Sequence, residues 1–391
     1  NNSLQQRLRL PVFGEIFKYA DTMKCLFTIL MLSSLPFSLP AITMTTDYRL
    51  PEPVTREHNR ITVGVFPQVE LISVVQAISK YTETFAFLMA KDSTDYARDA
   101  ARHFGHYVNH PAIAMFNRLS LQPRMLNFSA PSNIMLYTDE SLHLRDDIIH
   151  DSFVTDRVGG PDSLSVFLNL LRDFARESDF NIFFSTHLDY YGTIAENTVN
   201  AIGPMNYIAE LEGFYGTGQK SYNIVLVSLY GSVGYGNSIL HPDGKRDIYN
   251  TMGPRPAKDG LHSFGDEEYL RHMIRHEFSH PFINPLTEKY WDTVKEYSAN
   301  YDRIPEVARK NVCGDWQECI NEFMIRAITT HLAYNDSEEA GNKAYAREKS
   351  RGVSCLDELL KNIRLYESER NTFPTFDSFY PTTLKVFQDP D

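Results

Sequence analysis

Residues 269–284 read YLRHMIRHEFSHPFIN, and the letters HEFSH at positions 276–280 match the motif H-E-x-x-H. Positions i and i+4 of a helix lie on one face, so His276 and His280 can direct two imidazoles at one metal ion. Glu277 lies about 100° around such a helix from His276, where its carboxylate can accept a proton from a metal-bound water. The motif predicts a helix that carries a zinc site and its general base.

The sequence around the motif favours this helix. Three acidic residues, 266–268, precede it, and negative charge stabilises a helix N-terminus. Pro281 is expected to end the helix, because proline cannot donate the next backbone hydrogen bond. Four apolar residues give the segment a face that can be buried: Leu270, Met273, Ile274 and Phe278. The alternative, two histidines with purely structural roles, stays open at this point.

A catalytic zinc needs a third protein ligand and leaves its fourth position to water. The longer motif with a third histidine is absent, because Ile283 and not glycine stands three residues after His280. We therefore expect a carboxylate from the helix predicted over about 315–333. Glu322 is favoured and Glu318 is the runner-up. An ion pair between Glu322 and Arg326, four residues apart, is a competing structural role, and both roles can hold at once.

The segment NEFMIRA, residues 321–327, resembles the pattern of the gluzincin metallopeptidases, whose zinc ligands are His, His and Glu. Arg326 stands where that pattern often has an acid, so the groups around the third ligand are expected to differ. Three further segments in order, VELISVVQAISKY, IVLVSLYGSVGYGN and HEFSHPFINP, resemble a bacterial family described as domain of unknown function 4932, known mainly from Bacteroidetes. The resemblance implies a zincin-like (gluzincin-like) fold and a secreted zinc metallopeptidase, and it supplies no substrate.

The strand-like segments are concentrated before residue 260, and the rest of the chain is mostly helical. Residues 60–67 and 221–231 are the clearest strands, rich in β-branched residues. This order favours an α+β fold over a regular α/β alternation. We expect one catalytic domain over 58–391, with a mixed sheet in a lobe of about 58–260, a mostly helical lobe of about 261–391 and the active-site helix between them.

A peptide substrate of a zincin would be held as an added strand along a sheet edge. The strand at 221–231, with its glycine-rich extension 232–237, is expected to supply that edge, and Gly234 and Gly236 would allow close backbone approach. A hairpin turn between two structural strands is the alternative. The developing oxyanion needs a further donor. Three residues without a supporting motif are candidates: Tyr235, Tyr297 and His331.

The N-terminal part predicts the location of the protein. Residues 23–41, MKCLFTILMLSSLPFSLPA, have the plan of a secretory signal peptide, and the apolar run is shorter than the ~20 residues of a membrane-spanning helix. We expect a secreted or periplasmic protein without a stable membrane span, with 42–57 as a lead-in. Residues 1–22 are expected to lie upstream of the true start at Met23, which N-terminal sequencing of the secreted protein would test.

Charge and cysteine content narrow the classes further. A net charge of −12 without a basic stripe argues against nucleic acid as a partner. Three cysteines follow the predicted signal, and an odd number excludes a fully paired framework. Cys313 and Cys319 can pair in an oxidising compartment, which leaves Cys355. No Cys-x-x-Cys pair indicates a thiolate zinc site.

Together these features predict a secreted hydrolase with one catalytic Zn²⁺, most simply a peptidase acting on peptides or proteins. Two alternatives stay open. One is a non-catalytic secreted binding protein on a zincin scaffold, although a structural zinc site would not need Glu277 as a base. The other is a zinc hydrolase of non-peptide esters or amides, because zinc-water chemistry serves these as well.

Overall fold

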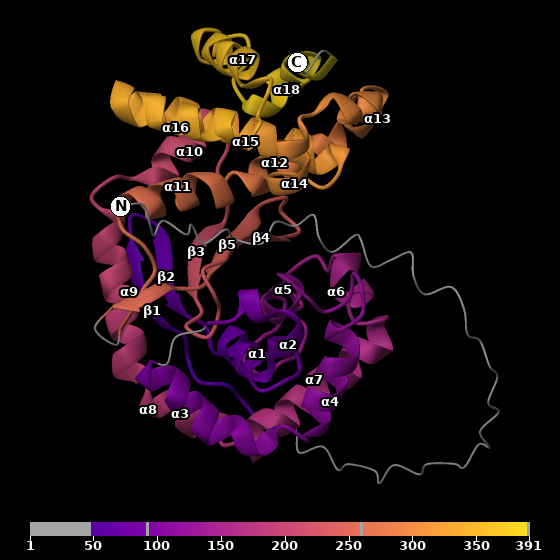
Figure 1. Ribbon diagram of the computed structural model, residues 1–391, viewed down its shortest axis with the longest axis vertical. Coiled ribbons are helices and arrows are strands. Elements are labelled where there is room, and N and C mark those ends of the chain that lie inside the picture. Colours follow the sequence, from indigo (N-terminus) through magenta and orange to yellow (C-terminus); the bar gives the residue numbers. More distant parts are fainter. Residues whose placement is uncertain (1–47, 91–93, 259–260, 389–391) are drawn as a thin grey trace, which may run out of the picture. The chain divides into compact units, whose positions relative to one another are not determined.

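Figure 1 shows the computed structural model, which describes residues 48–90, 94–258 and 261–388. The predicted signal peptide and the extension before it lie outside these residues. The chain divides into two compact units. The larger unit contains Asp47–Leu286 and Glu369–Phe379, and the smaller one contains Thr287–Ser368 and the residues from Tyr380 onward.

A five-stranded mixed sheet lies in the larger unit, in the order β1-β2-β3-β5-β4. The two inner pairings, β2 with β3 and β3 with β5, are parallel, and the two outer pairings are antiparallel. The strands are β1 (Val54–His58), β2 (Ile61–Val65), β3 (Ser221–Leu226), β4 (Gly234–Leu240) and β5 (Arg246–Met252). A separate two-stranded sheet joins β6 (Arg255–Lys258) to β7 (Leu261–Ser263).

Burial explains which strands are visible in the sequence. Strand β3 is buried at five of its six positions, so it reads as a continuous apolar run, as parallel strands covered on both faces do. Strand β1, VTREH, lies within the predicted lead-in except for its last residue. Its residues are half-buried or exposed because it is an edge strand. The charged residues break the apolar pattern by which a strand is recognised in the sequence.

The sheet of the larger unit is covered by helices, as Figure 1 shows. Helix α9 packs on β1 and β2, whereas α11 packs on β4 and β5. Helix α7 has Gly160 as its N-cap, and the φ of 109° at this residue favours glycine. The bounds are α1 (Pro67–Ala77), α2 (Tyr81–Thr84), α3 (Asp95–Phe104), α4 (Pro111–Ser120), α5 (Ala130–Leu136), α6 (Ser152–Asp156), α7 (Pro161–Glu177), α8 (Phe180–Thr186), α9 (Leu188–Ile202) and α10 (Tyr207–Tyr215).

The motif is split between two helices, which corrects the prediction that Pro281 ends a single one. Helix α11 (Glu267–Glu277) begins at the cap Asp266, whose carboxylate accepts the Tyr269 N–H at 2.9 Å. It ends at Glu277, and α12 (His280–Lys289) starts at the second histidine with Pro281 in its first turn. The break has a local cause, because Pro281 has no N–H to donate to the Glu277 carbonyl.

The smaller unit is helical, and its longest helix is α15 (Trp316–Asp336), which packs on α16 (Glu338–Ser350) and α17 (Leu356–Ser368). Cys313 and Cys319 form a disulfide across the start of α15, and Cys355 is a buried free thiol. The remaining helices of the C-terminal part are α13 (Trp291–Glu296), α14 (Glu306–Asn311) and α18 (Phe376–Leu384).

All the strands of the described residues come before residue 264, and the regular elements after that point are helices. The α+β class with a mixed sheet in the N-terminal region is therefore confirmed. None of the described helices combines the length and the hydropathy that are needed to cross a bilayer.

Candidate metal centre

The two motif histidines stay close despite the break between α11 and α12. Their ring centroids are 5.1 Å apart and the ring planes are inclined at 82°. His276 is 7% exposed. Helix α11 is held in place beside them, because the buried Arg275 donates to both carboxylate oxygens of Glu210 on α10, at 2.8 and 2.6 Å. The helix start, this ion pair and the early helix end together fix where the two imidazoles point.

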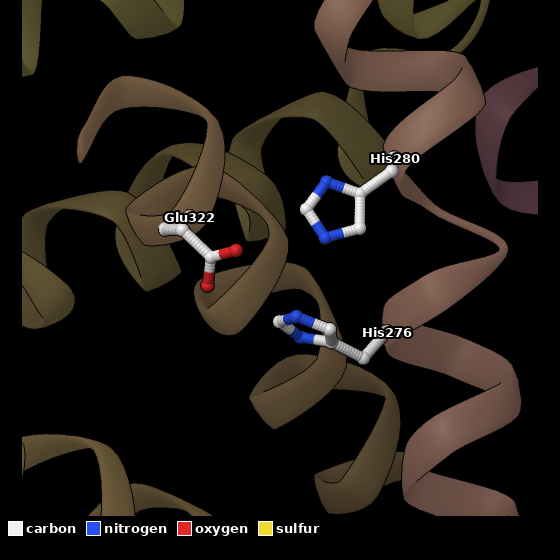
Figure 2. A group of neighbouring side chains, drawn as sticks. All are labelled: His276, His280 and Glu322. Atoms are coloured by element: carbon white, nitrogen blue, oxygen red, sulfur yellow. The ribbon is translucent and has the colours of Figure 1, made fainter. Parts of the chain in front are cut away.

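Glu322 joins the two histidines in one group. Each of the three residues offers one ligand atom, and these atoms all lie within 4.8 Å of one another. Figure 2 shows the two imidazoles side by side with the Glu322 carboxylate directed toward them. Ligand atoms of a tetrahedral zinc site lie roughly 3.4 Å apart, given bonds of about 2.1 Å. Two imidazoles and one carboxylate are also a donor set that zinc accepts, so the group fits one ion after a small contraction.

Glu318 is not part of this group. It lies in the first turn of α15, where its Oε2 accepts the backbone N–H of Gly314 at 2.6 Å. Burial raises the pKa of its carboxyl group. The contact with the preceding loop accounts for the side chain, so the structure brings Glu322 and not the runner-up to the histidines.

The general-base candidate Glu277 lies against two glycines of β4. A Cβ atom on Gly236 would lie 2.7 Å from Glu277 Oε2 and 3.0 Å from the Glu277 carbonyl oxygen. A Cβ atom on Gly234 would lie 2.5 Å from Met273 Cε and 3.7 Å from Glu277 Oε1. A side chain at position 236 would therefore crowd Glu277 itself, whereas one at position 234 would crowd the flexible end of Met273, so the glycine at 236 is the one that leaves room for the carboxylate.

The position of the edge strand corrects the sequence prediction. Residues 221–231 were expected to form the edge, but β3 lies between β2 and β5 in the sheet. Residues 234–237 of the glycine-rich segment begin β4, which pairs with β5 on one side and not with β3. Strand order depends on pairings between distant segments, and the local sequence does not encode it.

None of the three oxyanion candidates belongs to the group of His276, His280 and Glu322. Tyr235 pairs with Thr251 in the sheet, so strand alternation turns it to the face opposite Gly234 and Gly236. The Tyr297 hydroxyl accepts a hydrogen bond from Gln388 at 2.7 Å. His331 lies 2.7 Å from a carboxylate oxygen of Glu367.

Two residues near the motif were missed in the sequence. His272 stands one turn before His276, with ring centroids 5.6 Å apart, and the repeated spacing of four could have revealed it. Asn250 on β5 is opposite Gly236 in the register and is fully buried, and neither polar atom of its side chain has a hydrogen-bond partner. An amide in a buried strand is the only signal that could have indicated it.

A family model supports the relationship noted from the motifs. The model of the Domain of unknown function (DUF4932) matches residues 61–386, so the chain belongs to this family. No curated protein and no solved structure matches the chain. The match includes both the motif and Glu322, but the description of the family names no activity, so a function has to be argued from the site itself.

Proposed function

We propose that this DUF4932 protein is a zinc-dependent hydrolase, most simply a peptidase, in which His276, His280 and Glu322 bind the metal. The observation that carries the proposal is the group of three ligand atoms within 4.8 Å, with a glutamate next to the first histidine. Bound zinc would supply a Lewis acid that lowers the pKa of a coordinated water to about 7.

Glu277 is the residue that we assign to proton transfer. It would take a proton from the attacking water and then pass it to the leaving amine. Its side chain comes from the last turn of α11, next to His276, and it is 8% exposed. Low exposure strengthens its electrostatic interactions with reacting groups, and the glycines beneath it define where its carboxylate can lie.

Strand β4 is the part of the structure that would hold an extended peptide. The Leu240 carbonyl accepts a hydrogen bond from the Ile149 N–H at 2.8 Å, so this residue directs its main chain away from β5. Main-chain groups alternate between the two sides of an antiparallel strand. The main-chain N–H and C=O groups of Ser238, Gly236 and Gly234 therefore also point away from β5, and the two glycines lie next to Glu277. A peptide aligned along β4 could pair with these groups while its scissile bond lies near the base.

We also propose that the protein acts outside the cytoplasm. The signal-like segment motivates this, and the disulfide between Cys313 and Cys319 is consistent with an oxidising compartment. A peptide or protein is the substrate class that an extended edge strand suits best, because its hydrogen bonds are made to a main chain.

The test combines metal analysis with cleavage of a peptide library, with and without a chelator. The parent should bind one zinc and cleave, His276→Ala and His280→Ala should lose the metal, and Glu277→Gln should keep it and lose cleavage. Glu268→Gln, an exposed acid in the first turn of the same helix, is the matched control and should behave as the parent. Cleavage by Glu277→Gln at the parent's rate would contradict the mechanism.

The two other functions give different results in the same experiment. A binding protein on this scaffold would cleave nothing, whether it contained zinc or not. A hydrolase of non-peptide substrates would leave the peptide library intact but would hydrolyse activated esters in a chelator-sensitive reaction.

A further inference from the structure

One oxygen of Glu322 is held by an arginine on the same helix. Arg326 donates from Nε to Glu322 Oε2 at 2.9 Å, and its NH2 group lies 2.8 Å from the same oxygen. Both contacts go to Oε2, and Oε1 receives none from Arg326. The two residues are four apart on α15, where side chains of one helix face meet. The guanidinium therefore fixes the plane of the carboxylate and distinguishes its two oxygens.

The other side of the guanidinium is held by a buried acid. Arg326 NH1 donates to Glu348 Oε2 on α16 at 2.8 Å, and the side chain of Glu348 is 0% exposed. Glu348 Oε1 accepts from Arg347 Nε at 2.6 Å, and Arg351 lies 3.6 Å from Oε2. Helices α15 and α16 run side by side in Figure 1. The result is a chain of ion pairs from Glu322 through Arg326 to Glu348.

The opposite charges in this series of ion pairs stabilise one another. Burial alone would raise the pKa of Glu348, but Arg326 and Arg347 outweigh it and lower the pKa, so the carboxylate stays ionised. The side chain of Arg326 is 10% exposed and lies between the carboxylates of Glu322 and Glu348, whose negative charges balance its own. A planar fork that contacts two carboxylates at once is a role that lysine, with its single ammonium, cannot fill.

We infer that Arg326, held by Glu348, is a positioning residue that presents Glu322 to the metal through a single oxygen. The inference rests on the proposed function, because it takes Glu322 as a metal ligand. A carboxylate with one oxygen committed to a guanidinium does not chelate with both. Three protein donor atoms would then leave one coordination position of a bound zinc to water, as hydrolysis requires. This gives a role to an arginine where the gluzincin pattern often has an acid.

The alternative is that the ion pairs only join α15 to α16. A charge-neutral double variant, Arg326→Met with Glu348→Leu, separates the two roles. Replacing both partners of a buried pair with apolar residues is often neutral or stabilising. Glu322 also loses its arginine in this variant, but its side chain is 12% exposed and is not sealed from solvent. Arg347 and Arg351 are 32% and 41% exposed, so they can turn to solvent when Glu348 is gone.

Zinc affinity, measured by competition with a chelating dye, is the readout. The double variant should fold, with a melting temperature near that of the metal-free parent, and should bind zinc 10- to 100-fold more weakly, the usual effect of losing a group that orients a metal ligand. The visible spectrum of the cobalt-substituted protein should change as well. The control Glu306→Leu with Lys310→Met, which removes an exposed pair on α14, should leave both readouts unchanged.

Zinc affinity within twofold of the parent in the folded double variant would overturn the inference. If that variant does not fold, Arg326→Lys keeps the positive charge and provides the same test, with at least a tenfold loss of affinity expected. Two outcomes concern the proposed function instead. Unchanged affinity in Glu322→Ala would remove Glu322 as a ligand, and a parent that binds no zinc would overturn both.

Discussion

At the scale of single residues, the candidate site depends on two glycines as well as on the proposed ligands and base. Gly236 and Gly234 stand on the face of β4 that α11 covers, where a methyl group would meet the Glu277 carboxylate or Met273. A glycine inside a strand weakens it, so a strand keeps one where another group must approach closely. The position of the proposed base therefore depends on the sequence of the strand that it packs against.

Gly236→Ala should reduce hydrolysis at least tenfold while zinc remains bound. The added Cβ atom would lie 2.7 Å from Glu277 Oε2 and 3.0 Å from its carbonyl oxygen, so either the strand or the base must shift. A displacement of about 1 Å can cost about a hundredfold in rate. The measurement is kcat with zinc content determined on the same samples.

The control is Gly213→Ala, a helical glycine of α10 with no atom within 4 Å of its Cβ position. It should leave activity unchanged and stabilise the protein by up to about 1 kcal/mol, because alanine is the better helix former. Full activity of Gly236→Ala would show that Glu277 does not need its present position.

Glu70 should make stability depend on pH. It lies buried in α1, accepts a hydrogen bond from Tyr96, and burial raises its pKa to about 7. The native state then keeps a proton that the unfolded chain loses near pH 4.5. Stability contributed by this proton is fully present below that pH and is lost as the pH rises to about 7. Glu70→Gln should remove about 3 kcal/mol of this dependence, measured by urea unfolding at pH 4 and pH 8. An equal dependence in both proteins would contradict the assignment.

At the scale of helices and strands, local features could be predicted and distant pairings could not. The apolar face and the acidic residues 266–268 indicated α11, which has Asp266 as its N-cap. The helix expected over about 315–333 is α15, which has Asp315 as its N-cap. The motif and a later glutamate also named the three residues that the structure groups. The edge position of β4 was missed because it follows from pairing with β5, and a strand glycine reads like a turn glycine. The side chain of Asn250 is buried without a hydrogen-bond partner, and this can be known only once its neighbours in the sheet are known.

The disulfide between Cys313 and Cys319 should support the start of α15, the helix that carries Glu322. It encloses the cap Asp315, whose carboxylate accepts the Glu318 N–H at 2.8 Å. Closing so short a loop is worth about 2 kcal/mol in the chain-entropy account. Reduction should lower the urea midpoint accordingly, and the variant Cys313→Ser with Cys319→Ser should not respond to reductant. A parent midpoint that reductant does not change would contradict this role.

At the scale of the whole molecule, the family match extends over residues 61–386 and thus over both compact units. The proposed ligands come from segments about 40 residues apart, so an unfolded chain would not present them together. Binding only to the folded state adds RT ln(1 + [L]/Kd) to its stability, about 4 kcal/mol at a thousandfold excess over Kd.

A chelator should therefore lower the melting temperature of the metal-loaded protein by several degrees, and added zinc should restore it. His276→Ala should melt at one temperature under both conditions, because it has lost a ligand. Scanning calorimetry at fixed protein concentration gives the comparison. A parent that melts identically with and without the chelator would show that no metal contributes to its folded state.

The outward-facing main chain of β4 limits what this protein could act upon. Recognition through a strand's carbonyl and amide groups reads the shape of a backbone and tolerates many side chains. A segment already in a helix or a sheet has its own backbone groups engaged, and it would have to give them up first. Well-folded proteins would therefore resist hydrolysis until heat, damage or an earlier cleavage unfolded part of the chain. Disordered termini, linkers and short peptides would be the preferred substrates.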